Sequence, residues 1–287
     1  MFPADFAYAR PRSLEEAFDL LDAAAEAGEE AKLIAGGQSL LPMMKLRLAA
    51  PQVLIDIADL KELGRGGFDG DSHTIGALTT YRQLSRQRFV SRDGAPTLVN
   101  GASSLVGGAP ALADALAVLA DPQVRARGTI GGAVAHGDPA SDLPAVLLAL
   151  NAELVIASRK GKREVPLDDF LQGIYTTDLA EDEIITHIRI DTGGARASAY
   201  EKFPHPASHL PLAGVCAVVR LRNGLIDGAE IAVTGISSRP YRARAAEALL
   251  KGAPPTPETM AAAATQVTRL PDGRQASLLG DQHASAP

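Results

Sequence analysis

The sequence predicts an α+β protein of two domains, on the evidence of its length, its strand and helix pattern, and a change of that pattern after residue 176. A chain of 287 residues is longer than one typical core needs and suits two domains. Hydrophobic residues make up 46% and charged residues 22%, an ordinary globular mixture. Strands alternate with helices up to residue 176, and a run of strands followed by helices is expected after it.

Composition excludes several classes of function. The net charge is −6 and no basic cluster is dense enough to follow a phosphate backbone, so nucleic acid is not expected as a partner. Cys216, the one cysteine, lies in an apolar run and is expected to be a buried thiol. One cysteine forms no disulfide within the chain and cannot hold an iron–sulfur cluster, which needs about four ligands. With no signal-peptide core and no apolar run of about 20 residues, the protein is expected to be soluble and cytoplasmic.

The first domain, residues 1–176, is predicted to consist of two subdomains. In the first, residues 1–57, Ser13 and Glu16 fit a capping box that begins a helix, and Gly28 is placed to end it. In the second, residues 58–176, Thr79 is expected to cap a short helix through Leu84. The remaining elements expected here are strands at 32–35, 53–57, 73–76 and 154–157, and helices from Pro110 and over 145–150.

The second domain, residues 177–287, is predicted to pair a small sheet with two helices. Its strands are expected at 183–190, 198–203, 214–221 and 229–236, and its helices at 239–250 and from Thr256 to about Thr268. The tail 275–287 has little periodicity and is expected to be disordered.

Two glycine-rich turns carry the functional signal. Residues 36–39 (GGQS) and residues 129–132 (TIGG) each follow or precede an expected strand, and each combines paired glycines with a hydroxyl residue. Glycine allows positive φ and close approach of the backbone to a ligand, and successive N–H groups in such turns bind anions. The Ser39 and Thr129 hydroxyls add possible donors. The two loops together suit a pyrophosphate. Either loop alone is also explained as a simple tight turn.

Other sites are weakly supported. Neither loop matches the dinucleotide pattern Gly-x-Gly-x-x-Gly or the P-loop, and no Gly-x-Ser-x-Gly elbow is present. His136, with Asp138 and Asp142, resembles a metal or acid–base site, but in a Gly/Pro-rich loop these residues are more often turn formers. Asp142 either caps the helix that follows or accepts a hydrogen bond from a ligand hydroxyl.

Residues 35–48 (AGGQSLLPMMKLRL) and 127–132 (RGTIGG) followed by 138–144 (DPASDLP) resemble the two FAD signatures of a known family. That family comprises the medium subunits of carbon monoxide dehydrogenase and its relatives, together with the flavin domain of xanthine dehydrogenase. The resemblance also includes residues 6–11, 75–77 and 200–202 and extends to about residue 270. Two long motifs in the right order are far more specific for this family than either glycine pair alone.

The resemblance implies a two-subdomain FAD-binding fold of the vanillyl-alcohol-oxidase (PCMH) type, followed by a small α+β domain. It implies that loops 35–39 and 129–133 hold the FAD pyrophosphate, that Asp142 and Lys202 lie beside the nucleotide, and that Ile184 or Ile185 lies near the ring. The residues expected to bind FAD are Leu33, Ile34, Ala35, Gly36, Gly37, Gln38, Ser39, Leu40, Thr129, Ile130, Gly131, Gly132, Ala133, Asp142, Ile184 and Lys202.

The resemblance also implies partners. They are a small subunit with two [2Fe–2S] clusters and a large molybdopterin subunit, in a dimer of heterotrimers. The substrate is then oxidised at molybdenum, and this chain passes electrons from the clusters through FAD to an external acceptor. No residue of this chain is expected to be catalytic or to bind a metal. The alternatives are a self-sufficient FAD oxidase of the same fold and a flavin-free scaffold subunit.

Three features depart from the family pattern. Ala133 stands where relatives often have Asn or Ser, so one side-chain contact with FAD is expected to be replaced by backbone. The single cysteine argues against the 4-hydroxybenzoyl-CoA reductase branch, which carries extra cysteines for another cluster. The usual last helix is replaced by residues 272–277 and a polar tail, which predicts a less stable C-terminal domain.

Overall fold

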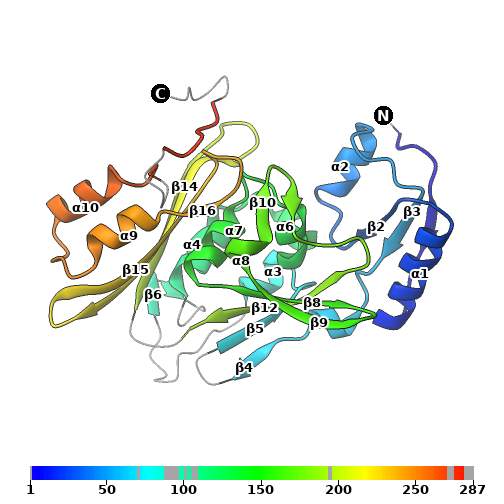
Figure 1. Cartoon of the computed structure of the whole chain (residues 1–287), viewed down its shortest axis with the longest axis horizontal. Helices are drawn as coiled ribbons and strands as arrows, with labels where there is room; N and C mark the ends of the chain where they lie inside the picture. Colours follow the sequence, from blue (N-terminus) through cyan, green and yellow to red (C-terminus); the bar gives the residue numbers. More distant parts are fainter. Residues whose placement is uncertain are drawn as a thin grey trace.

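The computed structural model describes residues 2–69, 72–86, 97–99, 102–104, 109–192, 196–269 and 275–280. Along the long axis in Figure 1, the C-terminal helices and sheet are followed by a group of central helices and then by the N-terminal sheet. Within the described ranges, no helix combines the length and apolar character needed to cross a membrane.

The N-terminal subdomain is a parallel three-stranded sheet with one helix against it. Its elements are β1 (Ala7–Ala9), α1 (Leu14–Glu26), β2 (Ala31–Ile34) and β3 (Val53–Asp56), and the strand order is β1-β3-β2. Ser13 accepts a hydrogen bond from the Glu16 N–H, and Gly28 adopts φ 70° after the last turn, so the predicted helix ends are confirmed. Phe18 and Leu21 of α1 pack with Ile55 of β3 in one core. Strand β2 therefore delivers loop 35–39 at its carboxyl end, before helix α2 (Leu40–Lys45).

The second subdomain is built on an antiparallel five-stranded sheet in the order β4-β5-β12-β8-β9. Its strands are β4 (Gly67–Asp69), β5 (Ser72–Gly76), β8 (Glu153–Ser158), β9 (Gly161–Pro166) and β12 (Ile184–Asp191). The other elements are η1 (Lys61–Gly64), α3 (Tyr81–Leu84), β6 (Thr97–Val99), β7 (Ala102–Ser104), α4 (Pro110–Val118), α5 (Pro122–Arg127), α6 (Ile130–His136), α7 (Asp142–Ala149), α8 (Leu167–Phe170), β10 (Leu171–Gly173) and β11 (Thr176–Thr177).

One predicted helix cap in this subdomain is displaced by a residue. Helix α3 is capped by Thr80 rather than Thr79, because Thr80 forms a complete capping box with Gln83. The Gln83 N–H donates to the Thr80 hydroxyl at 3.2 Å, and the Thr80 N–H donates to the Gln83 side chain at 2.9 Å. The helix from Pro110 is confirmed, and its apolar stripe from Leu112 to Leu119 is buried.

The C-terminal domain is a four-stranded antiparallel sheet with helices on both faces. Its elements are β13 (Ala197–Pro204), β14 (Pro211–Arg222), β15 (Leu225–Thr234), β16 (Tyr241–Arg242), α9 (Arg244–Leu250) and α10 (Pro257–Ala264). Along β14, Cys216 and Val218 join the core of α4 and α7, whereas Val215 and Ala217 pack with the core of α9 and α10. This alternation follows the two-residue period of a strand, so the sheet lies between the two groups of helices.

Three sequence expectations are corrected here. The strand expected at 183–190 does not join the C-terminal sheet, because β12 pairs with β5 and β8 instead. We therefore propose a domain boundary between residues 191 and 197 in place of 176. The helix expected from Arg239 begins at Arg244, because Tyr241 first pairs with Val233 in the sheet.

The third correction concerns the tail. Residues 275–280 are not disordered: Ala276 is buried in the core of α9 and α10, and the Leu279 N–H donates to the Ile236 carbonyl at 2.9 Å. An extended segment thus covers part of the core of α9 and α10. The remainder of the predicted disordered tail, 281–287, lies outside the described residues, as do residues 272–274 of the altered C-terminal motif.

Candidate cofactor-binding site

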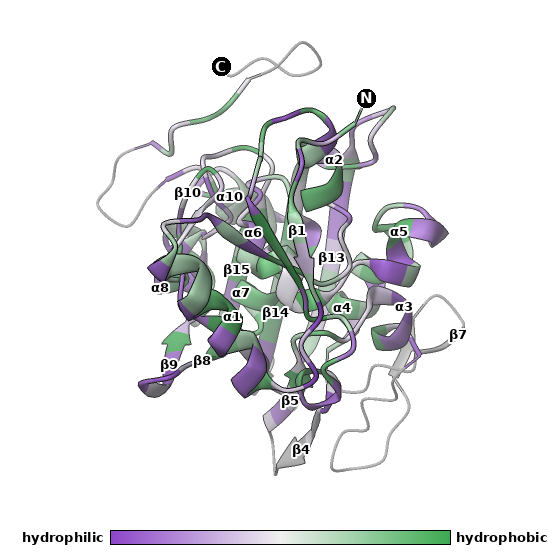
Figure 2. Ribbon diagram, turned by 90° about the vertical axis from the view of Figure 1, so that its right-hand side faces the viewer, coloured by the Kyte–Doolittle hydropathy of each residue, from purple (hydrophilic) through white to green (hydrophobic). Residues whose placement is uncertain are grey.

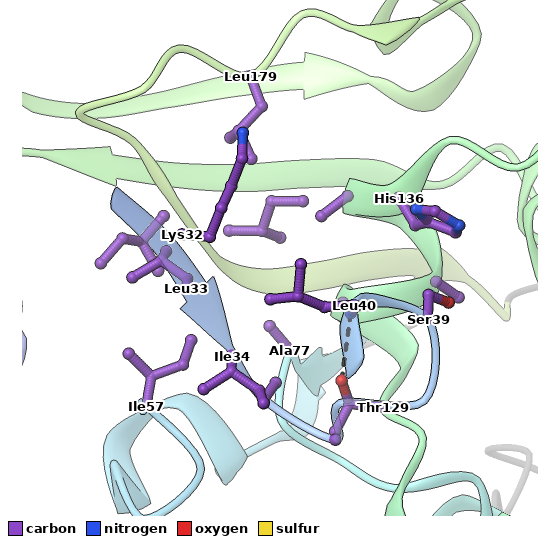
Figure 3. Close-up of a pocket in the computed structure, with 18 of the residues that line it drawn as sticks. Lys32, Leu33, Ile34, Ser39, Leu40, Ile57, Ala77, Thr129, His136 and Leu179 are labelled. Atoms are coloured by element: carbon purple, nitrogen blue, oxygen red, sulfur yellow. Dashed lines mark hydrogen bonds between the residues drawn. The ribbon is translucent and has the colours of Figure 1, made fainter. Parts of the chain in front are cut away.

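A cavity of about 550 Å³ lies between the first two subdomains, which is within the size range of small-ligand sites. In Figure 3, Leu33, Ile34 and Ile57 lie on one side of it, and Ser39 and His136 lie on the other. The cavity thus has an apolar half and a polar half. The predicted FAD residues that line it are Leu33, Ile34, Ala35, Gly36, Gly37, Gln38, Ser39, Leu40, Thr129, Gly131, Gly132, Ala133 and Ile184.

The loop after β2 lines this cavity and carries a row of backbone donors without protein acceptors in the described part of the chain. Among the described residues, no protein group accepts a hydrogen bond from the N–H groups of residues 36–39. Gly37 adopts φ 72°, a conformation that turns the chain and that β-branched residues rarely adopt. Successive free N–H groups around such a turn form an anion-binding concavity, so this loop suits a phosphate group.

The second glycine loop contributes shape rather than free backbone donors. At the start of α6, the N–H groups of Ile130 and Gly131 donate to the carbonyls of Thr79 and Ala77, at 3.0 and 2.9 Å. The next N–H, of Gly132, donates to the Thr129 hydroxyl at 3.2 Å, the bond drawn as a dashed line in Figure 3. Because that hydroxyl acts as an acceptor here, its own proton is available to a ligand.

Two of the glycines allow close packing around the site, because a side chain at either position would clash with neighbouring residues. A Cβ atom at Gly36 would lie 2.1 Å from the Arg127 carbonyl oxygen, and one at Gly131 would lie 2.6 Å from the Ala77 side chain. A Cβ at Gly132 would meet only the Thr129 hydroxyl, at 2.8 Å. Gly36 therefore allows the two subdomains to meet beside the cavity, and Gly131 allows α6 to pack closely on Ala77 within the second subdomain. Gly132 instead leaves room for a ligand.

An aromatic pair lies beside the polar half. His136, at the end of α6, packs against Tyr175 with ring centroids 4.9 Å apart, and both line the cavity. Burial lowers the pKa of His136, although Asp138 opposes the shift, so the imidazole is neutral at neutral pH. Tyr175 has φ 50° in the turn between β10 and β11, and its N–H donates to the Gly137 carbonyl at 3.1 Å.

Ile130, Asp142 and Lys202 do not line the cavity. Ile130 belongs to the core. Lys202 and Asp142 are both buried, and the lysine Nζ lies 3.0 Å from the carboxylate. The Tyr200 hydroxyl donates to the same carboxylate at 2.7 Å, and Lys202 also donates to the His209 carbonyl at 2.8 Å.

This buried group ties helix α7 to strand β13, and so the first domain to the C-terminal sheet. Burial raises the pKa of the Asp142 carboxyl, and the Lys202 ammonium and the Tyr200 hydroxyl oppose that shift. Asp142 is the first residue of α7 rather than its cap, which is Ser141. The expected contact of Asp142 and Lys202 with the nucleotide stays a prediction.

Several lining residues were not predicted. Lys32 lies in β2 and Ile57 directly follows β3, whereas Tyr175 lies in the β10–β11 turn and Leu179 in the segment after it. Alternation along β2 indicates that its two faces differ, but not which face borders a cavity. His136 was weighed as a metal or acid–base residue; the structure places it in the cavity wall through the tight turn at Gly137, which has φ 62°.

The residues present fit the FAD that the sequence resemblance implies. The free donors of loop 36–39 suit a pyrophosphate, and Thr129 and Ser39 provide hydroxyl groups in the same half of the cavity. Leu33, Ile34 and Ile184 offer apolar surface to a ring. The polar half of the cavity thus suits the charged centre of FAD, and the apolar half suits one of its ring systems.

Comparison with known proteins extends over nearly the whole chain. Residues 4–191 match the family described as the FAD binding domain in molybdopterin dehydrogenase, and residues 198–285 match the CO dehydrogenase flavoprotein C-terminal domain. The carbon monoxide dehydrogenase medium chain of Hydrogenophaga pseudoflava is 38% identical over 265 residues, which cover 92% of this chain and 86% of that protein.

The nicotine 6-hydroxylase medium subunit of Paenarthrobacter nicotinovorans is 37% identical over 279 residues, which cover 97% of this chain and 90% of that protein. Among solved structures, carbon monoxide dehydrogenase from Hydrogenophaga pseudoflava matches with a TM-score of 0.83 and 40% identity, covering 93% of this chain and 87% of that one. The similarity therefore includes both domains and the order in which they follow.

Proposed function

Because this chain belongs to the family of FAD-binding medium subunits of molybdenum hydroxylases, we propose that it takes electrons from a [2Fe–2S] subunit and passes them to an external acceptor. FAD, the cofactor of this family, can accept electrons from one partner and deliver them to another. Substrate oxidation takes place at a molybdopterin cofactor in a large subunit, and the complex is a dimer of heterotrimers. The chain's own residues bind and orient FAD.

The observation that carries this proposal is that equally similar relatives are named for unrelated substrates. The medium chains of glyceraldehyde dehydrogenase from Sulfolobus acidocaldarius, of carbon monoxide dehydrogenase and of nicotine 6-hydroxylase are 34%, 38% and 37% identical to this chain. An aldehyde, a diatomic gas and a nitrogen heterocycle share no recognition chemistry. A subunit that all three enzymes use in similar form is therefore suited to a step common to them, and electron transfer is such a step.

Within the site, each part of the chain has a role in holding the cofactor. The N–H groups of residues 36–39 would bind the pyrophosphate, and the Thr129 hydroxyl would donate from the second loop. Leu33, Ile34 and Ile57 would cover a ring and exclude water from it. The neutral imidazole of His136 adds no positive charge beside the cofactor at neutral pH.

The self-sufficient oxidase is less well supported. An independent oxidase needs a substrate pocket against the flavin, and the C-terminal domain would have to supply part of it. The residues that line the cavity end at Ile185, before the C-terminal domain begins. The flavin-free scaffold is disfavoured by the free donors at residues 36–39, which a simple tight turn would not need to present to a cavity.

We predict that Gly132→Val, placed in the purified complex, separates substrate oxidation from delivery of electrons to the acceptor. The valine side chain would enter the ligand space with only the Thr129 hydroxyl nearby, so FAD should be lost while the fold is kept. On anaerobic addition of substrate, the iron–sulfur absorbance of the variant complex should still bleach, whereas reduction of a quinone analogue should fall at least about a hundredfold.

Adding back the native chain loaded with FAD should restore acceptor reduction. If the FAD-free complex reduces the acceptor at the native rate, electrons leave by another route and the proposal is wrong. Far-ultraviolet circular dichroism of the variant chain provides the control for folding.

A further inference from the structure

Five exposed cations on helices α2, α3 and α5, or directly after them, form what we call the basic surface. They are Lys45, Arg47, Arg82, Arg86 and Arg127. None of them has an ion-pair partner among the described residues, although most arginines elsewhere in those residues are paired with carboxylates. The chain as a whole has the opposite net charge, −6.

Helices α3 and α5 pack together beside the cavity, and α2 follows the loop that meets the end of α5. The carbonyl of Arg127 meets the backbone of Gly36, and the Tyr81 N–H donates to the Gly128 carbonyl at 3.0 Å, which joins α3 to the end of α5. In Figure 2, α5 and α3 lie one above the other at the right of the molecule, and α2 lies above them toward the middle. Tyr81 and Gly128 line the cavity, but none of the five cations does. The basic surface therefore borders the FAD site and faces outward rather than toward the phosphates.

Exposed leucines in α2 and in the residues directly after it lie next to Lys45 and Arg47 in the sequence. Leu41, Leu46 and Leu48 have exposed fractions of 39%, 60% and 72%. The end of α2 holds them there, because the Leu48 N–H donates to the Met43 carbonyl and the Arg47 N–H to the Met44 carbonyl. Arg47 has φ 59°, a position where glycine is usual, so an arginine is kept at a conformational cost. An apolar patch with charged neighbours is typical of a protein interface.

The geometry points to an acidic face of the iron–sulfur subunit as the occupant of the basic surface and its three leucines. This inference rests on the proposed function, which requires an electron donor next to the FAD cavity. Unpaired cations on a surface favour binding to a partner surface of opposite charge. The exposed leucines favour a permanently bound subunit over a soluble acceptor, because permanent interfaces are more apolar than transient ones.

The test measures how tightly the iron–sulfur subunit of the native complex binds this chain. Three forms are compared: native, Arg82→Glu/Arg127→Glu, and Lys162→Glu/Lys251→Glu. The last reverses two exposed cations outside the basic surface. The first double variant should raise the dissociation constant at least about tenfold, and the control should leave it within about twofold. Native binding should weaken as salt rises, and the first variant should lose most of that dependence.

A second variant, Leu46→Ser/Leu48→Ser, examines the apolar part. It should weaken binding at all salt concentrations without changing the salt dependence. FAD content is measured in every variant, and native content shows that the cofactor site is intact.

Three outcomes would overturn the inference. The first is native affinity for the iron–sulfur subunit in both variants. The second is normal assembly with slower reduction of the external acceptor only, and the third is that the variants lose self-association of this chain rather than binding of the subunit. These outcomes are distinct from failure of the proposed function, in which substrate never reduces the flavin of the native complex.

Discussion

Replacing Gly36 with alanine is expected to empty the cavity of FAD and to destabilise the chain, although the change adds only one methyl group. The added Cβ would lie 2.1 Å from the Arg127 carbonyl oxygen and 2.7 Å from its carbon. These are backbone atoms, which cannot turn away as a flexible side chain would. The two loops must therefore separate, and the donors of residues 36–39 move from their positions.

The expected loss for Gly36→Ala is more than about a hundredfold in FAD affinity and about 1–3 kcal/mol in the free energy of unfolding. Flavin fluorescence after release measures occupancy, and urea denaturation measures stability. Gly64→Ala is the matched control, because a Cβ there meets nothing within 4 Å. Native occupancy and stability in Gly36→Ala would show that the loops do not meet as described.

Replacing Lys202 with methionine is expected to cost about 3–5 kcal/mol of unfolding free energy, because it leaves the buried Asp142 carboxylate without its cation. Lys160→Met is the control: its partner Asp182 lies at 3.2 Å, but the lysine side chain is 86% exposed. An exposed pair contributes less than about 1 kcal/mol. The double change Asp142→Asn/Lys202→Met should recover part of the loss, because no unpaired charge is then buried.

The loss in Lys202→Met should depend on pH. Burial already raises the pKa of the Asp142 carboxyl above 3.8, and removal of the ammonium that opposes this shift raises it further. A carboxyl whose pKa is higher in the folded state binds its proton more tightly there. Stability is then greatest below the unfolded pKa and falls as pH rises through the folded pKa. The variant should therefore be closer to native stability at pH 4 than at pH 7, and an equal loss at both would contradict a buried carboxylate.

Local signals in the sequence predicted the parts of the fold that are stabilised locally. Ser13 and Gly28 specify the ends of α1 through hydrogen bonds within a few residues. Loop 36–39 was predicted as a ligand loop because consecutive glycines follow a strand. The displaced cap at Thr80 shows the limit of such signals, since two adjacent threonines compete and the position of Gln83 decides between them.

Local sequence patterns did not predict which strands pair when they lie far apart in the chain. Strand β12 has the same apolar character as the strands after it, yet its partners β5 and β8 lie earlier in the chain. Nothing within residues 184–191 specifies which sheet they join. The same holds for His136 and Tyr175, which come from separate elements and meet only in the folded chain. The role of Gly36 as a packing contact also depends on Arg127, 91 residues away.

The most direct test of the electron-transfer function is to follow the flavin absorbance of this chain on anaerobic mixing with the substrate of the complex. The measurement compares the complete complex with the same subunits lacking the iron–sulfur subunit, and dithionite is added last to each. In the complete complex the flavin should bleach. Without the iron–sulfur subunit it should remain oxidised until dithionite reduces it. Bleaching by substrate at the same rate in both mixtures would show that this chain obtains electrons by another route, and would contradict its role as an electron-transfer subunit.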